Sequence, residues 1–129
     1  MIILNINLNQ IQTILAESIN MEELDENNII KLQITNPEIK ENKVLAEILK
    51  NERSLKGFLL SFIDNMEIND LDISIDDTQN VIEIKANNSN IYLNLTQLLN
   101  EVLYGDFFQQ FSTELTQTFD VKFGDEFKL

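Results

Sequence analysis

The stretch Asp64–Ala86, DNMEINDLDISIDDTQNVIEIKA, contains the clearest strand pattern of this chain, and the expected fold is built around it. From Leu71 to Asp76 apolar and polar residues alternate, which is the two-residue period of a strand with one buried and one solvated face. Residues Asp77–Asn80 favour a turn, and Val81–Ala86 alternates again. The stretch therefore predicts a β-hairpin whose first strand carries aspartates on its solvated face.

Acidic residues without basic neighbours distinguish this hairpin from the rest of the chain. Residues 64–77 contain no lysine or arginine, whereas five of the nine basic residues lie upstream between Lys40 and Lys56. We therefore expect an acidic face without local counter-charges. The residues that we expect to bind a partner through this face are Asp64, Glu67, Asp70, Asp72, Asp76 and Asp77.

The hairpin also has the ligand spacing of a calcium-binding EF-hand loop. Its oxygen-bearing residues at that spacing are Asp72, Ser74, Asp76, Thr78, Asn80 and Glu83. However, the sixth loop position, which needs glycine for its sharp turn, is Asp77. The flanks also alternate as strands where an EF-hand has helices, so we predict no metal site.

Upstream of the hairpin, residue spacing predicts strands and helices in alternation. Alternating apolar residues predict strands over Ile2–Leu8 and Asn28–Thr35. We expect a helix from about Gln10 to Asn20, capped by Asn9, and a charged loop over residues 21–28. Pro37 opens a long helical segment to residue 66, which we expect to be two helices with a bend, the second capped by Ser54.

Downstream of the hairpin we expect one more strand and then helices. Alternation over Ile91–Thr96 predicts the third strand of a meander, followed by a short helix that stops at Gly105. Another helix begins at Asp106, and residues 119–123 predict an edge strand. The chain is thus expected to be a single α+β domain over residues 1–129. It should have a largely antiparallel sheet, including a three-stranded meander at about residues 70–96, with helices packed on one face.

Histidine and cysteine are both absent, which removes the usual general base and the usual ligands of zinc. The three glycines are isolated, so the sequence has no phosphate-binding loop. We therefore expect no enzyme activity, no catalytic residues, no cofactor and no metal. The lack of cysteine and of a basic, apolar leader favours a cytoplasmic protein.

The formal net charge of −13 predicts what kind of partner the chain can bind. Such a charge repels nucleic-acid phosphates and anionic lipids, so we expect neither direct nucleic-acid binding nor membrane binding. It attracts basic protein surfaces. Small acidic inhibitors of nucleases, including immunity proteins and phage-encoded inhibitors of host defence, use their carboxylates in this way as a class.

Three hypotheses follow, in decreasing order of preference. The first is a non-enzymatic inhibitor that engages a basic protein through its acidic face. The second is an assembly subunit or chaperone that forms a homodimer through aromatic residues near the C-terminus, where Phe107, Phe108 and Phe111 are either core residues or partner contacts. The third is a domain that binds a small ligand between sheet and helices.

Overall fold

Four antiparallel strands form one sheet in the computed structural model, which describes residues 8–123. They are β1 (Ile19–Leu24), β2 (Ile29–Ile34), β3 (Leu71–Asp76) and β4 (Val81–Ala86). Their order across the sheet is β1-β2-β4-β3, and each neighbouring pair is antiparallel. The predicted α+β class with a largely antiparallel sheet is confirmed.

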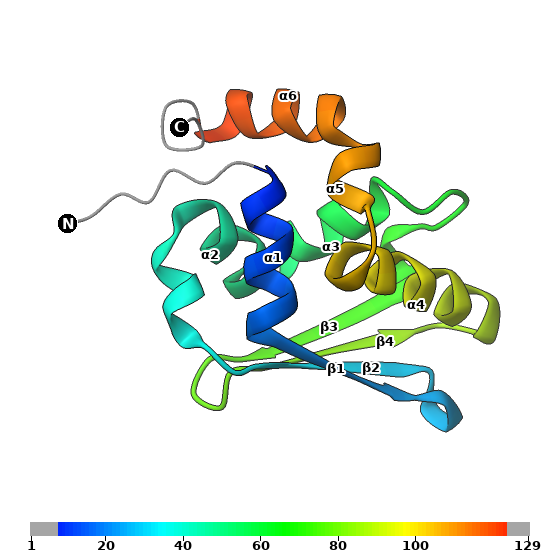
Figure 1. The fold of residues 1–129 in the computed structure, drawn as a ribbon. Helices are drawn as coiled ribbons and strands as arrows, with labels where there is room; N and C mark the ends of the chain where they lie inside the picture. Colours follow the sequence, from blue (N-terminus) through cyan, green and yellow to red (C-terminus); the bar gives the residue numbers. More distant parts are fainter. Residues whose placement is uncertain (1–7, 124–129) are drawn as a thin grey trace.

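The helices lie over one face of this sheet, as Figure 1 shows. Three short 3₁₀ helices connect the main elements: η1 (Asp25–Asn27), η2 (Pro37–Glu41) and η3 (Ile68–Asp70). The α-helices are α1 (Leu8–Ser18), α2 (Lys43–Lys50), α3 (Glu52–Leu60), α4 (Ser89–Tyr104), α5 (Phe107–Gln110) and α6 (Ser112–Phe123). No helix in residues 8–123 has both the length and the apolar composition needed to cross a membrane.

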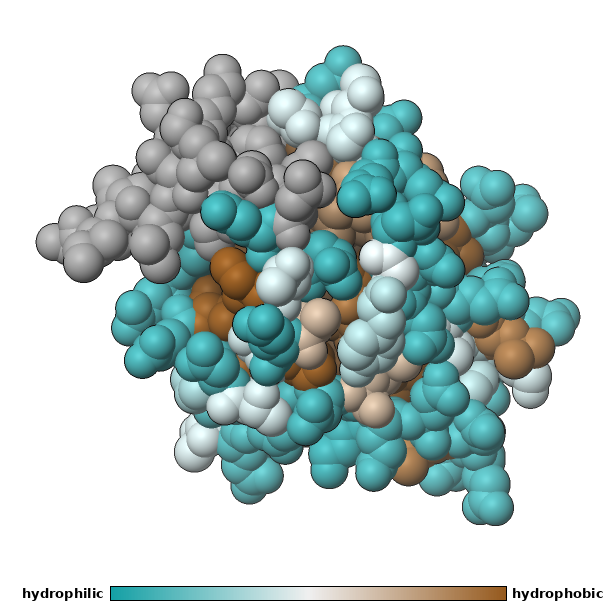
Figure 2. All heavy atoms as spheres, in the orientation of Figure 1, coloured by the Kyte–Doolittle hydropathy of each residue, from teal (hydrophilic) through white to brown (hydrophobic). Residues whose placement is uncertain are grey.

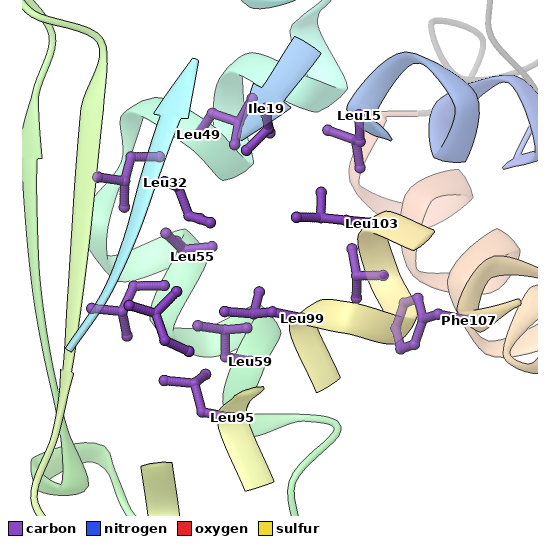
Figure 3. Packing of buried hydrophobic residues seen from close by; sticks show 14 of the residues in the cluster. Leu15, Ile19, Leu32, Leu49, Leu55, Leu59, Leu95, Leu99, Leu103 and Phe107 are labelled. Carbon is purple, nitrogen blue, oxygen red and sulfur yellow. The ribbon is translucent and has the colours of Figure 1, made fainter. Parts of the chain in front are cut away.

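Strand alternation explains why the sheet buries only its helix-facing side. In β4 the residues Ile82, Ile84 and Ala86 are buried, whereas Glu83 and Lys85 are exposed on the opposite face. These buried residues join apolar side chains of the helices in one core, part of which Figure 3 shows. Figure 2, in the orientation of Figure 1, shows hydrophilic residues over most of the visible surface.

The predicted acidic hairpin is confirmed. Strand β3 pairs with β4 in an unbroken register from Leu71 opposite Ala86 to Asp76 opposite Val81. Since side chains alternate across a strand, the aspartates at 72 and 76 lie on the face without helices. The hairpin thus borders one edge of the sheet.

The predicted third meander strand, Ile91–Thr96, is wrong because these residues belong to helix α4. The Asn88 side chain accepts a 2.9 Å hydrogen bond from the Ile91 backbone N–H and so caps this helix. Helical spacing buries Ile91 and Leu95 and leaves Leu93 58% exposed. The second neighbour of β4 in the sheet is therefore β2, which lies far away in sequence.

Two other segments also differ from the expectation. The predicted charged loop over residues 21–28 is shorter, because Ile19–Leu24 pairs with β2 as strand β1 and leaves only residues 25–28 to turn. Asn28 adopts a φ of 56°, a left-handed conformation that asparagine tolerates better than most residues. Residues 119–123, predicted as an edge strand, continue helix α6.

The described N-terminal helix begins earlier than expected. Helix α1 starts at Leu8, so Asn9 lies within it and not at its cap. The rest of the predicted strand Ile2–Leu8 lies outside the described residues.

The expected break in the long helical segment is confirmed, although its cap is a different residue. Asn51 separates α2 from α3, and its side chain accepts hydrogen bonds from the Arg53 and Ser54 backbone N–H groups at 3.0 and 3.2 Å. Ser54, predicted as the cap, instead donates a 2.7 Å hydrogen bond to Glu47 of α2. This bond holds the two helices together across the bend.

Candidate functional site

A groove of about 390 Å³ opens between the segment that follows helix α3, the outer side of α4 and the short helix α5. We call it the aromatic groove. It is lined by Phe62, Ile63, Asp64, Asn65, Asn94, Gln97, Leu98, Glu101, Phe107, Gln110 and Phe111. The groove brings together residues from both predicted sets, since it contains Asp64 of the acidic set and two of the three predicted phenylalanines.

Aromatic rings form the floor of this groove. The rings of Phe62 and Phe107 meet edge to face with centroids 4.8 Å apart, and Phe111 lies 5.1 Å from each of them. Such contacts are favourable beyond the apolar area that they bury. Phe62 and Phe111 remain half-buried, so parts of both rings are accessible to a partner.

Polar side chains surround the floor. The exposed members of this rim are Asp64, Asn65, Asn94, Gln97, Glu101 and Gln110. Two of them carry carboxylates, and no lysine or arginine is among the described residues that line the groove. An apolar centre within a polar rim is the usual anatomy of a protein-binding patch. The groove therefore suits a partner that presents an apolar residue beside a cation.

The second carboxylate of the rim, that of Glu101, lies at the C-terminal end of helix α4. Helix α4 ends at Gly105, as predicted, and the Gly105 N–H donates a 3.0 Å hydrogen bond to the Glu101 carbonyl. The Glu101 carboxylate lies against Gly105, where a methyl group would overlap it. Glycine thus leaves room for this carboxylate at the edge of the groove.

Two of the predicted partner-binding acids serve the fold itself. Asp70 accepts a 2.9 Å hydrogen bond from the backbone N–H of Glu67, which lies exposed just before η3. Asp76 accepts hydrogen bonds from the backbone N–H groups of Thr78 and Gln79 at 3.0 and 3.1 Å. These bonds shape the two ends of strand β3, because such side-chain acceptors stabilise turns.

The expectation that the acids lack local counter-charges is wrong for two of them. Lys40 of η2 forms an ion pair with Asp77, with 3.0 Å between Nζ and Oδ1. Asp72 lies directly opposite Lys85 of β4 in the sheet register, on the face without helices. Sequence distance hid Lys40, which lies in η2, whereas Lys85 lies within the predicted hairpin itself.

The six acids also do not share one face. Asp64 lies on the rim of the aromatic groove on the helical side, whereas the side chains of Asp72 and Asp76 lie on the open side of the sheet. Of the six, Asp64 alone lines the concave site.

Burial separates the three predicted phenylalanines. Phe107 and Phe108 are 1% and 4% exposed and belong to the hydrophobic core, whereas Phe111 packs against the core and stays half-buried. The core interpretation therefore fits the first two, and Phe111 offers the ring surface for a partner. Phe62 was not among the predicted residues, because its contribution depends on how the segment after α3 packs against Phe107 and Phe111.

A second acidic region was not expected to be structured. Glu22 and Glu23 lie on strand β1, and Asp25 and Glu26 follow in η1. The buried Tyr92 hydroxyl donates a 2.6 Å hydrogen bond to Asp25. Burial, followed by this hydrogen bond and by the negative charge of Asp25, raises the pKa of Tyr92 to about 12.

An apolar space of about 50 Å³ lies between the sheet and the helices. Leu15, Ile19, Leu55 and Leu103 are among its lining residues, and Figure 3 shows their side chains around it. Ligand pockets usually measure about 300–1,000 Å³. This volume therefore gives little support to the small-ligand hypothesis.

Carboxylates are not gathered into a metal-binding cluster in the described part of the chain. Within residues 8–123 no three acidic side chains lie close enough together to hold an ion. The hairpin that shares the EF-hand spacing consists of two extended strands joined by a turn, and its flanks are not the helices of an EF-hand.

Comparison with known proteins gives no relative: no protein-family model, no curated protein and no solved structure matches this chain.

Proposed function

We propose that this chain is a non-enzymatic binding protein that engages a basic surface of a protein partner and so blocks or chaperones that surface. The observation that carries the proposal is the aromatic groove, with ring surface in its floor and carboxylates in its rim. The net charge of −13 adds long-range attraction for a basic partner. Binding thus combines electrostatic steering with an apolar anchor.

In this proposal the aromatic floor of the groove supplies an apolar anchor for the contact. Interfaces concentrate their binding energy in a few buried aromatic or arginine anchors, which a polar rim shields from water. Phe62 and Phe111 are half-buried and line the groove, so they are the residues that would form such an anchor. A partner arginine suits this site well, because its guanidinium can stack on an aromatic ring while it pairs with a carboxylate.

The charged part of the contact sets the rate of association. Asp64 and Glu101 are exposed and face the groove without a basic neighbour among its lining residues. Charges at an interface rim mainly change the association rate and its dependence on salt. The remaining acids extend this attraction over the surface.

The homodimer hypothesis receives less support from the geometry. Two of the three phenylalanines that suggested it are buried within one copy of the chain. Joining two copies through the groove would also bring the rim carboxylates of both copies together. Their like charges would repel each other, and the dimer would carry twice the net charge of one chain.

The test is affinity capture from the native host with three baits, followed by quantitative mass spectrometry. The baits are the wild-type chain, Asp64→Lys in the groove and Glu17→Lys on helix α1. Both substitutions change an exposed acid to lysine, so they alter net charge equally. We expect a basic protein that the wild type and Glu17→Lys capture and that Asp64→Lys loses. Equal capture by all three baits would refute the proposal.

A further inference from the structure

We propose that the outer edge of strand β3 accepts an extended basic segment of the partner as a fifth strand of the sheet. This inference rests on the proposed function, because the segment belongs to the basic partner. Among the strands of residues 8–123, β3 stands at the end of the order β1-β2-β4-β3 and pairs only with β4. An edge strand presents backbone donors and acceptors with which another extended chain can pair.

The hydrogen bonds between β3 and β4 show which backbone groups of β3 remain available to another strand. The Asn87 N–H donates a 2.8 Å hydrogen bond to the Asp70 carbonyl, one step beyond the pair of Leu71 and Ala86. In an antiparallel ladder the residues that bond the neighbour alternate with residues that face away from it. Leu71, Ile73 and Ile75 therefore turn their N–H and C=O groups outward. Among the hydrogen bonds of residues 8–123, none occupies these outward groups.

The edge of β3 lacks three of the features that usually prevent strand addition, namely proline, lysine and a bulge. Natural edge strands are commonly protected by proline, lysine, a bulge or a covering segment. The sequence LDISID contains neither proline nor lysine, and its pairing with β4 runs through six residues without a bulge. On the opposite edge, strand β1 includes the charged Glu23 among its outward-facing positions.

Side chains along β3 specify the chemistry of the added strand. Asp72 and Asp76 lie on the open face, and Ile73 and Ile75 are half-buried on the face toward the helices. An extended segment with lysine or arginine at alternate positions would place its charges beside the aspartates. Its intervening apolar residues would then cover the accessible parts of the isoleucines. Cross-strand pairs of both kinds stabilise sheets.

A second copy of the same chain fits this edge poorly. Antiparallel self-pairing centred on Ser74 would place Asp72 of one copy opposite Asp76 of the other. Self-pairing centred on Asp72 would place two copies of that carboxylate opposite each other. Like charges in directly opposed positions destabilise a sheet. The aspartates therefore favour a basic strand and disfavour these two registers of self-pairing.

The test uses a labelled heptapeptide of alternating lysine and valine and a control peptide N-methylated at alternate residues. N-methylation removes backbone donors and blocks pairing while it leaves the charge unchanged. With the wild-type chain we expect the unmodified peptide to bind about tenfold or more tightly than its control. Backbone amides of Leu71, Ile73 and Ile75 should gain protection from hydrogen exchange in the complex. Asp72→Lys should weaken binding, whereas Glu22→Lys on β1, an equal change in charge, should not.

Each alternative outcome overturns strand addition at β3. These outcomes are equal binding of the two peptides, protection of β1 amides in place of β3 amides, and no binding at millimolar peptide concentration. The proposed function is tested separately by the groove variant Asp64→Lys with the captured partner. If Asp64→Lys loses capture and the peptide test is negative, the groove remains the proposed binding site and strand addition at β3 is rejected.

Discussion

The Tyr92 hydroxyl donates a 2.6 Å hydrogen bond to Asp25 Oδ1 and thereby ties helix α4 to the turn that follows strand β1. The two residues lie 67 positions apart in the chain. Because the tyrosine is buried, this contact links the packing of α4 to the proton on one hydroxyl group.

This contact predicts a loss of stability at high pH. The folded state holds the pKa of Tyr92 at about 12, above the ordinary value of 10.0. Deprotonation therefore favours the unfolded chain, so the contribution is complete below pH 10 and is lost as the pH rises through 12. Urea denaturation between these pH values should show a smaller decline for Tyr92→Phe than for the wild type. Parallel declines in the two proteins would contradict this assignment.

Lys40 should stabilise the hairpin turn mainly through a neutral partner. Its Nζ donates to Asn80 Oδ1 at 2.6 Å and to Asp77 Oδ1 at 3.0 Å. Asp77 is 59% exposed, so solvent screens its ion pair, whereas the lysine side chain is only 10% exposed. We expect Lys40→Met to lower the free energy of unfolding by about 1–2 kcal/mol. Asp77→Asn should lower it by less than about 0.5 kcal/mol in the same denaturation assay. A larger loss for Asp77→Asn than for Lys40→Met would reverse this ranking.

Asp76 and Asp72 should differ although both lie on the open face of β3. The Asp76 carboxylate accepts two backbone hydrogen bonds in the turn, so Asp76→Ala should cost about 1–2 kcal/mol of unfolding free energy. Asp72 has only Lys85 across the strand, and Asp72→Ala should change stability by no more than about 0.5 kcal/mol. Thermal unfolding of the two variants side by side measures the difference. Equal melting temperatures would show that the turn does not depend on this carboxylate.

The acidic hairpin could be predicted from sequence because its signal is local. Leu71, Ile73 and Ile75 alternate with polar residues, and the four residues after Asp76 all favour a turn. The break between α2 and α3 was predicted for the same reason. In both places the residues that determine the structure lie within a few positions of one another.

Residues 91–96 of helix α4 were wrongly predicted as a strand, because their apolar residues fit both the two-residue period of a strand and the spacing of a helix. In IYLNLT the apolar residues alternate, but Ile91, Leu95 and Leu99 also recur every four residues. A strand would bury Leu93 with its neighbours, whereas the helix leaves it exposed. The Asn88 cap and the longer run of helical spacing decide in favour of the helix.

The aromatic groove was only partly predictable, because it depends on tertiary packing. Asp64 and Phe111 were candidates by charge and by aromatic clustering, but nothing in the sequence placed them beside each other. Glu101 entered the site only once residues 91–104 formed one continuous helix. Likewise, the pairing of Lys40 with Asp77 required the arrangement of η2 beside the hairpin.

Binding at the aromatic groove should be visible in the association rate of the captured basic partner, measured at low and at moderate salt. It should be recorded for the wild type, Asp64→Lys and Glu17→Lys, with unfolding curves to confirm that all three are folded. If the groove receives the partner, Asp64→Lys slows association by about tenfold at low salt and Glu17→Lys changes it much less. Added salt should reduce the difference in association rate between the two variants. Equal rates for Asp64→Lys and Glu17→Lys at both salt concentrations would contradict a binding site at the aromatic groove.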